Sequence, residues 1–115
     1  MSEEKMSDIE VHPDDEVTIV FRKIKRDGRT TVKRLETVPV PPPDGEKVQY
    51  FDIQTSVVFE GNIKIRIISE QARLGEILQW EDKQWVDRTL CCVNVGRRYK
   101  LIVGVTDHLS FFAIR

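Results

Sequence analysis

The chain has 115 residues, of which 32% are charged and 40% are hydrophobic, and its net charge is −1. This length suits one domain with a substantial core. The near-zero net charge gives no overall attraction to nucleic acid or to anionic membranes. No apolar run reaches the roughly 20 residues of a membrane-spanning helix. We therefore expect a globular domain with no membrane span, and no sequence motif indicates a cofactor.

The first 15 residues are polar and acidic. We expect a mobile acidic N-terminal tail over residues 1–15 and a single β-sandwich domain over residues 16–115. The tail lacks the apolar stretch of a signal peptide. The expected location is therefore cytoplasmic if the chain is complete, and extracellular if it is a domain cut from a longer secreted parent.

Residues 16–38 contain two strand-like segments around a turn. Apolar side chains alternate from Val17 to Phe21, which is the period-2 pattern of a half-buried strand. Asp27-Gly28 is a strong short-range turn signal. The pattern predicts a hairpin with strands over residues 16–24 and 30–38.

This predicted hairpin is also the most basic part of the chain. Its Lys and Arg residues, opposed by Asp27, are Arg22, Lys23, Lys25, Arg26, Arg29, Lys33 and Arg34. One hypothesis is a phosphate-binding ribbon in which Arg26 and Arg29 contact nucleic acid. The other is a solvated face that protects a sheet edge. Because stacking aromatic residues are absent here apart from Phe21, nucleic-acid binding is the less favoured hypothesis.

Residues 38–45 contain four prolines and end in Asp44-Gly45. Proline donates no hydrogen bond to a sheet, so this segment cannot be a central strand. The composition predicts a rigid extended connector. A ligand for an aromatic-lined recognition module is the alternative.

Residues 48–69 predict the centre of the fold. Ile63, Ile65 and Ile67 alternate with Lys64 and Arg66, as in a strand with one buried face. The preceding Glu60-Gly61-Asn62 supplies residues that tolerate the positive φ of a tight turn. We therefore predict two long strands paired as a central hairpin about residues 60–62.

The C-terminal half predicts only short strands. Gly96-Arg97-Arg98 and Glu81-Asp82-Lys83 are expected turns. The expected strands cover residues 77–80, 84–87, 89–95, 99–106 and 109–114. With about eight or nine strands and no persuasive helical period, the predicted fold is all-β, an antiparallel β-sandwich of Ig-like or UPA-like type.

Cys91 and Cys92 are the two cysteines of the chain, and they are adjacent. Neighbouring Cα atoms lie about 3.8 Å apart, below the roughly 4.4–6.8 Å of ordinary disulfides. We expect one thiol to face the core and the other to face outward. An adjacent pair with two distant histidines is not a zinc signature, so no metal site is predicted.

Three short segments resemble a β-sandwich module that occurs as a repeat or C-terminal unit in large bacterial and archaeal surface proteins. The segments are Tyr50-Phe51-Asp52-Ile53, Gln84-Trp85-Val86-Asp87 and Leu109-Ser110-Phe111-Phe112-Ala113-Ile114. Phe111 stands where that family has proline. The resemblance covers residues 48–114. It implies a spacer or binding unit without catalysis, whose partners are neighbouring domains of a larger protein or a separate protein.

The same end of the chain resembles the autoproteolysis site of adhesion-type receptors (GPS/GAIN) and, more loosely, UPA-type domains. The matching residues, in order, are Trp80, Trp85, Cys91, His108, Leu109, Ser110, Phe112, Ala113 and Ile114. The resemblance implies that His108 polarises the hydroxyl of Ser110, which attacks the preceding carbonyl to form an ester that water hydrolyses. Thr106 replaces the second cysteine of the motif, so its disulfide is absent.

The sequence therefore favours a non-enzymatic structural or protein-interaction module. Exposed aromatic residues can anchor a protein partner, and the candidates are Trp85 and Tyr99, with Trp80 expected to be buried and Trp85 half exposed. One alternative is a self-cleaving module, cut between Leu109 and Ser110. The other is a nucleic-acid binder that uses the basic hairpin.

Overall fold

The computed structural model describes residues 9–44 and 48–115, which form ten strands. The strands are β1 (Ile9–Asp14), β2 (Val17–Arg26), β3 (Thr30–Leu35), β4 (Gln49–Thr55), β5 (Val58–Ser69), β6 (Ile77–Glu81), β7 (Gln84–Asp87), β8 (Thr89–Val95), β9 (Tyr99–Thr106) and β10 (Phe111–Ile114). Among these described residues, no helix has the length and apolar character to cross a membrane.

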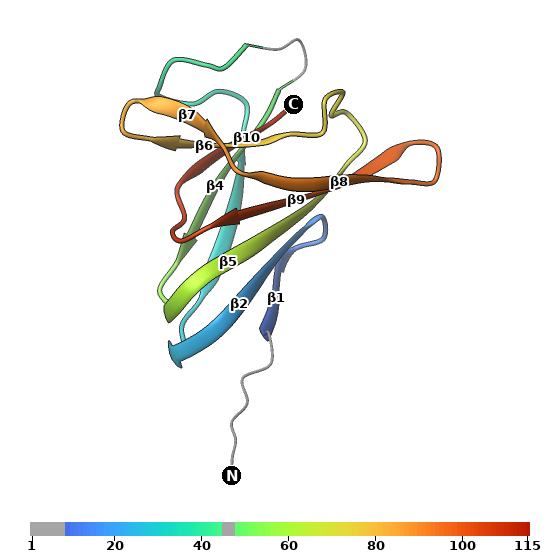
Figure 1. The fold of residues 1–115 in the computed structure, drawn as a ribbon. Coiled ribbons are helices and arrows are strands. Elements are labelled where there is room, and N and C mark those ends of the chain that lie inside the picture. The colour runs from blue at the N-terminus through green and yellow to red at the C-terminus, as the bar shows by residue number, and fades with distance from the viewer. Residues whose placement is uncertain (1–8, 45–47) are drawn as a thin grey trace.

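The strands form two five-stranded sheets that face each other (Figure 1). Sheet A has the order β1-β2-β5-β9-β8, and sheet B has the order β3-β4-β10-β6-β7. Every pair of neighbouring strands is antiparallel. The prediction of an all-β antiparallel sandwich is confirmed.

The core lies between the sheets. Sheet A contributes alternate side chains of β2 and β5 together with one from β9, and sheet B contributes side chains of β4, β6 and β10. The fully buried members are Val17, Ile19, Phe21, Phe51, Ile53, Ile63, Ile65, Ile67, Ile77, Ile102, Phe112 and Ile114. The alternation predicted for β2 and β5 is therefore correct, because burying one face of each strand removes its apolar side chains from water.

The two long hairpins expected in the N-terminal half are wrong, because in both cases the chain changes sheets at the corner. Strand β2 belongs to sheet A and β3 to sheet B. The chain then returns from β4 in sheet B to β5 in sheet A at Ser56-Val57. The two corners are joined by backbone and side-chain hydrogen bonds, from Ser56 N to Arg29 O at 2.9 Å and from Arg29 N to Ser56 Oγ at 2.8 Å.

Gly61 lies inside a strand and not in a turn. Strand β5 runs through residues 60–62, and its pairing with β2 passes from Phe21↔Ile63 to Lys23↔Glu60. Gly61 and Asn62 thus lie together opposite Arg22, as in a β-bulge. The φ of Gly61 is 84°, so its conformational freedom serves the bulge.

The sandwich begins before the expected domain start at residue 16. Residues 9–14 form β1, which pairs with β2 through Ile9↔Phe21 and Val11↔Ile19. Val11 packs against the core, which explains why this part of the expected acidic tail is a strand. The remainder of that tail, residues 1–8, lies outside the described residues.

Two predicted hairpins of the C-terminal half are confirmed. Strands β6 and β7 meet at Asp82 and Lys83, whose φ angles of 52° and 66° are those of a tight primed turn. Strands β8 and β9 meet at the turn containing Gly96.

The proline-containing connection joins β3 to β4 within sheet B, and the indole of Trp85 donates a hydrogen bond to Pro41 O at 2.7 Å.

Candidate functional site

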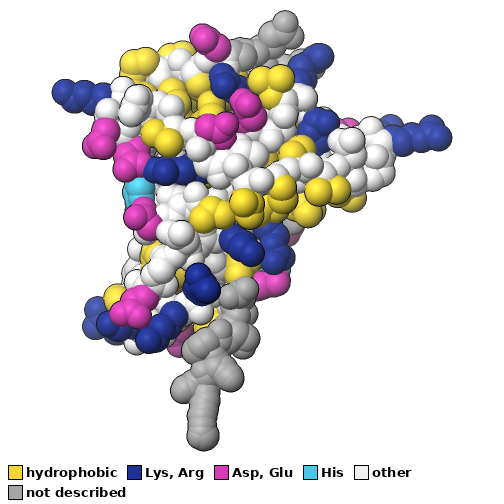
Figure 2. All heavy atoms as spheres, viewed as in Figure 1, with side chains coloured by type: hydrophobic (Ala, Val, Ile, Leu, Met, Phe, Trp, Pro, Cys, Tyr) yellow, Lys and Arg dark blue, Asp and Glu magenta, His cyan; other side chains and the backbone are white. Residues whose placement is uncertain are grey.

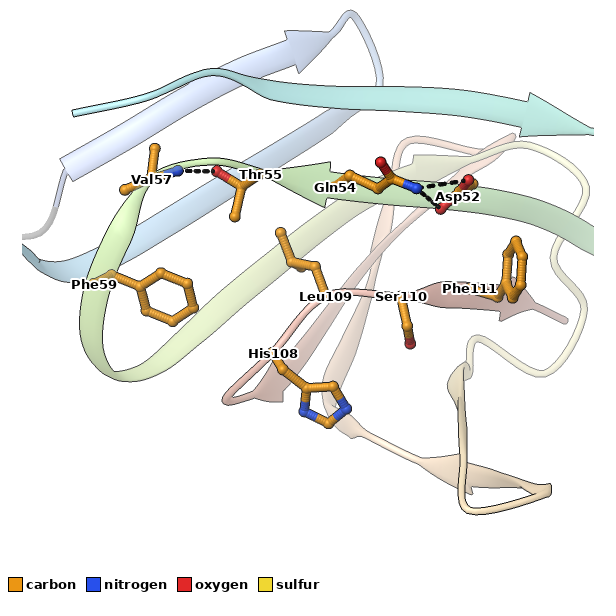
Figure 3. A pocket seen from close by; sticks show the side chains of 9 residues that line it. All are labelled: Asp52, Gln54, Thr55, Val57, Phe59, His108, Leu109, Ser110 and Phe111. Atoms are coloured by element: carbon orange, nitrogen blue, oxygen red, sulfur yellow. Dashed lines mark hydrogen bonds between the residues drawn. The ribbon is translucent and has the colours of Figure 1, made fainter. Parts of the chain in front are cut away.

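The corner between β9 and β10 borders an open cavity of about 590 Å³ (Figure 3). It is lined by Asp52, Gln54, Thr55, Val57, Phe59, His108, Leu109, Ser110 and Phe111. Strand β10 lies between β4 and β6, so its entry is held on both sides by paired strands. This arrangement brings His108 and Ser110, the alternative catalytic residues, to the same wall of one cavity.

His108 is oriented by carboxylates and not by the serine. Its Nδ1 lies 2.7 Å from Asp107 Oδ1, and its Nε2 lies 4.0 Å from Glu81 Oε1. The hydrogen bond from His108 lowers the pKa of the exposed Asp107 carboxyl from its usual value. Both ring nitrogens of His108 therefore face acidic groups.

Ser110 has other partners. Its hydroxyl donates to Trp80 O at 3.2 Å and accepts a hydrogen bond from Gln79 Nε2 at 3.1 Å. Among the described residues no hydrogen bond joins Ser110 to His108, so the base is not positioned to take the hydroxyl proton. Within the same residues, the non-glycine positive φ angles occur at Asp82 and Lys83 and not at the Leu109-Ser110 bond.

Gln79 is the polar centre of this corner, and the sequence interpretation did not identify it. Its side chain is fully buried, and its Nε2 donates to His108 O at 3.0 Å as well as to Ser110. Its Oε1 accepts from Thr106 Oγ1 at 2.7 Å and from Arg88 Nε at 3.0 Å. All four hydrogen-bonding positions of the amide are filled. Strand alternation alone predicts that this side chain faces the core, because Gln79 lies two residues after the inward-facing Ile77.

The aromatic candidates lie apart from this cavity. Trp85 and Trp80 are both half-buried and pack edge to face at 5.3 Å between ring centroids. Trp80 is not buried as expected, because it points to the outer face of sheet B while Gln79 points inward. Tyr99 is exposed at the start of β9, on the outer face of sheet A.

The basic segment is divided between two sheets and partly neutralised. Lys23 and Lys25 pair with Glu60 at 3.3 and 3.1 Å. Arg34 pairs with Asp14 at 2.7 Å and with Glu16 at 2.8 Å. Arg26 and Arg29, the proposed nucleic-acid contacts, are exposed beside the corner after β2. The structure thus spreads these charges and does not form the continuous two-stranded ribbon that the hairpin hypothesis required.

Both cysteines are exposed, which corrects the prediction that one faces the core. Cys92 lies opposite Ile102 on the inward side of sheet A, and Cys91 lies opposite Val103 on the outward side. The alternation is right, but β8 is an edge strand whose hairpin with β9 extends past the sandwich (Figure 1). Within the described parts of the chain, no group of His, Cys, Asp or Glu side chains has the arrangement of a metal site.

The outer face of sheet A carries an apolar surface that the sequence interpretation also missed. Strands β8 and β9 and the end of β5 bring its members together by direct cross-strand pairing. We call this the β8–β9 surface, and it comprises Ile68, Cys91, Val93, Val95, Tyr99, Leu101 and Val103. Figure 2 shows hydrophobic side chains gathered along strands β8 and β9. Val93 is 53% exposed and Val95 is 45% exposed.

The chain has no match among protein-family models, curated proteins or solved structures.

Proposed function

We propose that this chain is a non-enzymatic β-sandwich module that acts by binding protein through the β8–β9 surface. The observation that carries the proposal is the exposure of Val93, Val95, Tyr99 and Ile68 on one continuous sheet face. Contiguous apolar patches of this kind mark interaction sites on globular proteins. Aromatic residues such as Tyr99 are common anchors in protein interfaces.

The position of the resembling segments is consistent with this role. The three segments shared with the surface-protein module occupy β4, β7 and the β10 region, all within sheet B. They would then maintain the sandwich, leaving sheet A to carry the binding surface. The resemblance supports a spacer or binding unit and supplies no catalytic residue.

The two alternatives have less support. Self-cleavage needs a base beside the attacking hydroxyl, but Ser110 contacts Trp80 O and Gln79 instead of His108. Nucleic-acid binding needs phosphate contacts, and three of the basic side chains already pair with acids. If Arg26 and Arg29 did bind phosphates, affinity for duplex DNA would fall steeply with salt, with a logarithmic slope of about −0.9 per contact.

Affinity capture followed by reconstitution tests the proposal. A partner retained by the wild-type chain should bind directly when purified, and Val93→Lys should weaken that binding at least tenfold. Thr31→Lys, an exposed substitution on the β3 edge, is the matched control and should bind normally. The bound partner should also slow alkylation of Cys91. A partner that binds both variants equally would show that another surface is responsible.

A further inference from the structure

The outer face of sheet A contains a second cavity, of about 320 Å³, beside the β8–β9 surface. Its lining residues are Val20, Arg22, Asn62, Lys64 and Val105. They come from three neighbouring strands, because Val20 of β2 lies opposite Lys64 of β5, and Lys64 lies opposite Val105 of β9. We call this cavity the basic groove, since its charged lining residues are Arg22 and Lys64.

The basic groove has an apolar floor and a cationic rim. Val20 alternates with the inward-facing Ile19 and Phe21 but is only 2% exposed, so surrounding side chains cover it. Arg22 and Lys64 are exposed. Long cationic side chains cover apolar surface with their methylene groups and keep the charge in water. The two charges therefore lie where a ligand in the groove would meet them.

The acidic side chains nearest to the basic groove have other partners. Glu60 pairs with the two lysines of β2 at 3.3 and 3.1 Å, and Glu10 lies 3.3 Å from Arg66. Among residues 9–44 and 48–115, no salt bridge involves Arg22 or Lys64. The groove thus presents two positive charges that the described residues do not neutralise.

We propose that the basic groove receives a carboxylate side chain of the protein partner that covers the β8–β9 surface. This inference rests on the proposed function and adds the chemistry of the partner, which presents an acidic residue beside an apolar strip. Arginine and a carboxylate form charge-assisted, bidentate hydrogen bonds, and the amide of Asn62 supplies a further donor. Opposite charges across an interface speed association and select the partner.

The basic groove and the β8–β9 surface lie close enough for one partner to reach both. Val105 lines the groove, and Val103, two residues earlier on β9, belongs to the apolar surface. Lys64 is separated from Val93 by two strand spacings and four residues along the strands, which is about 10 Å across the sheet and about 13 Å along it. A standard interface of about 800 Å² per partner is roughly 30 Å across. Figure 2 shows Lys and Arg side chains next to the hydrophobic side chains along strands β8 and β9.

Nucleic acid and anionic membranes fit this face less well than an acidic protein. Single-stranded nucleic acid is held by aromatic rings that stack on its bases, and none of the described residues that line the groove is aromatic. Anionic lipid is recognised by clusters of about 4–8 Lys or Arg residues, whereas the groove has Arg22 and Lys64. The exposed Val93 and Val95 need an apolar counterpart, which protein side chains supply.

Selection of phage-displayed random peptides on the full-length chain tests the chemistry of the partner. We expect the retained peptides to combine Asp or Glu with apolar residues, and the acidic residues to be lost when the selection uses Lys64→Glu. Lys33→Glu makes the same charge change at an exposed position on β3 and is the matched control, which should retain acidic peptides. Retained peptides without acidic residues, or no retained peptides, would overturn the proposal.

Calorimetric titration with one retained peptide measures the contribution of each charge. Lys64→Glu and, independently, Arg22→Glu should weaken binding roughly tenfold or more, because attraction becomes like-charge repulsion, and Lys33→Glu should change it less than about twofold. Added salt should weaken binding to the wild type more than binding to Lys64→Gln. All variants should keep the wild-type thermal unfolding midpoint, since these side chains are exposed. Equal affinities of Lys64→Glu and Lys33→Glu would overturn the proposal.

Vesicles that contain anionic lipid, and duplex DNA, are the two further probes. We expect neither to bind the wild-type chain at physiological salt. Binding of either probe that is lost in Lys64→Glu and kept in Lys33→Glu would overturn the carboxylate assignment and assign the groove to phosphate.

The two proposals fail in distinguishable ways, which Val93→Asn separates because it removes an apolar contact without changing the charge. A peptide whose binding is weakened by Val93→Asn and not by Lys64→Glu would remove the acidic contact and retain the protein-binding surface. A peptide whose binding is weakened by Lys64→Glu and not by Val93→Asn would overturn the β8–β9 surface as the binding site and retain the carboxylate contact of the groove.

Discussion

Gln79 shows at the level of one residue how the final corner of the sandwich is held. Its buried amide joins Thr106 of β9, Arg88 between β7 and β8, and the β9–β10 corner at His108 and Ser110. A buried polar network is stabilising only when every member has a partner. Here the amide meets that condition, so the residue acts as a structural connector between the two sheets.

We predict that Gln79→Leu lowers the free energy of unfolding by about 2–4 kcal/mol, because it leaves buried donors and acceptors without partners. Chemical denaturation measures the change. Gln84→Leu, an exposed substitution on β7, should stay within about 0.5 kcal/mol. Adding Thr106→Val to Gln79→Leu should restore part of the loss, since one orphaned hydroxyl is removed. Strictly additive losses would contradict the network.

A second residue-level prediction concerns Asp14 and pH. The hydrogen bond from Arg34 lowers the pKa of Asp14, against the opposing effect of burial. A carboxyl with a lowered folded-state pKa adds stability above its unfolded pKa of about 3.9, and this stability is lost as pH falls through the folded value. Asp14→Asn should therefore cost up to about 1 kcal/mol at pH 7.

The difference between wild type and Asp14→Asn should disappear as the pH falls well below 4, when the wild-type carboxyl is protonated. Urea denaturation across this pH range measures it. The amide oxygen of asparagine can still accept the hydrogen bond from Glu16 N, so the turn itself is retained. Asp15→Asn, at an exposed neighbouring position, is the control. A pH-independent difference would mean that charge is not the cause.

At the level of elements, the corners between β2 and β3 and between β4 and β5 decide the topology. Gly28 allows them to approach, because a Cβ at this position would lie 2.5 Å from Ser56 C and 2.6 Å from Val57 N. Both neighbours are backbone atoms that cannot move aside independently. The glycine is therefore required by close approach, and not by a left-handed turn.

We predict that Gly28→Ala lowers the free energy of unfolding by about 1–3 kcal/mol through overpacking. Gly96→Ala is the comparison, since Gly96 has open space around it and a φ of 69°. That substitution should cost only about 1 kcal/mol of backbone strain. Denaturant titration of both variants measures which substitution lowers the free energy of unfolding more. A smaller loss for Gly28→Ala than for Gly96→Ala would show that the corners do not pack as described.

These glycines also explain what the sequence could and could not predict. Alternation correctly located β2 and β5, because burial of one strand face is a local property of the chain. It could not assign strands to sheets, because Asp27-Gly28 suits both a hairpin and a corner. Glu60-Gly61-Asn62 predicts a turn where the structure has a bulge, because a residue with positive φ suits turns and bulges alike. The sequence identifies His108 and Ser110 by residue type but does not predict their hydrogen-bond partners. The partners of Ser110 are Gln79 and Trp80, which lie about 30 residues earlier in β6.

At the level of the whole molecule, the two outer faces differ. Over sheet B, the indole N–H of Trp85 donates a hydrogen bond to Pro41 O in the long β3–β4 connection. The ring of Trp85 also packs beside that of Tyr50, with 6.4 Å between the ring centroids. On sheet A, the exposed side chains of Val93 and Val95 lie on an edge ribbon that projects from the sandwich (Figures 1 and 2). This asymmetry supports the proposal that the side of β8, rather than the side of β7, binds a protein partner.

The last prediction concerns whether the Leu109-Ser110 peptide bond, which precedes the central strand β10 of sheet B, is cleaved. We predict that the chain stays intact, because Ser110 contacts Trp80 O and Gln79 instead of a base. Strain of roughly 1–3 kcal/mol would also need support from the surroundings, and Thr106 removes the motif's disulfide. A native gel cannot decide, since a cleaved β10 would remain paired with β4 and β6. Intact mass under denaturing conditions can: loss of residues 110–115 in the wild type but not in Ser110→Ala would establish self-cleavage.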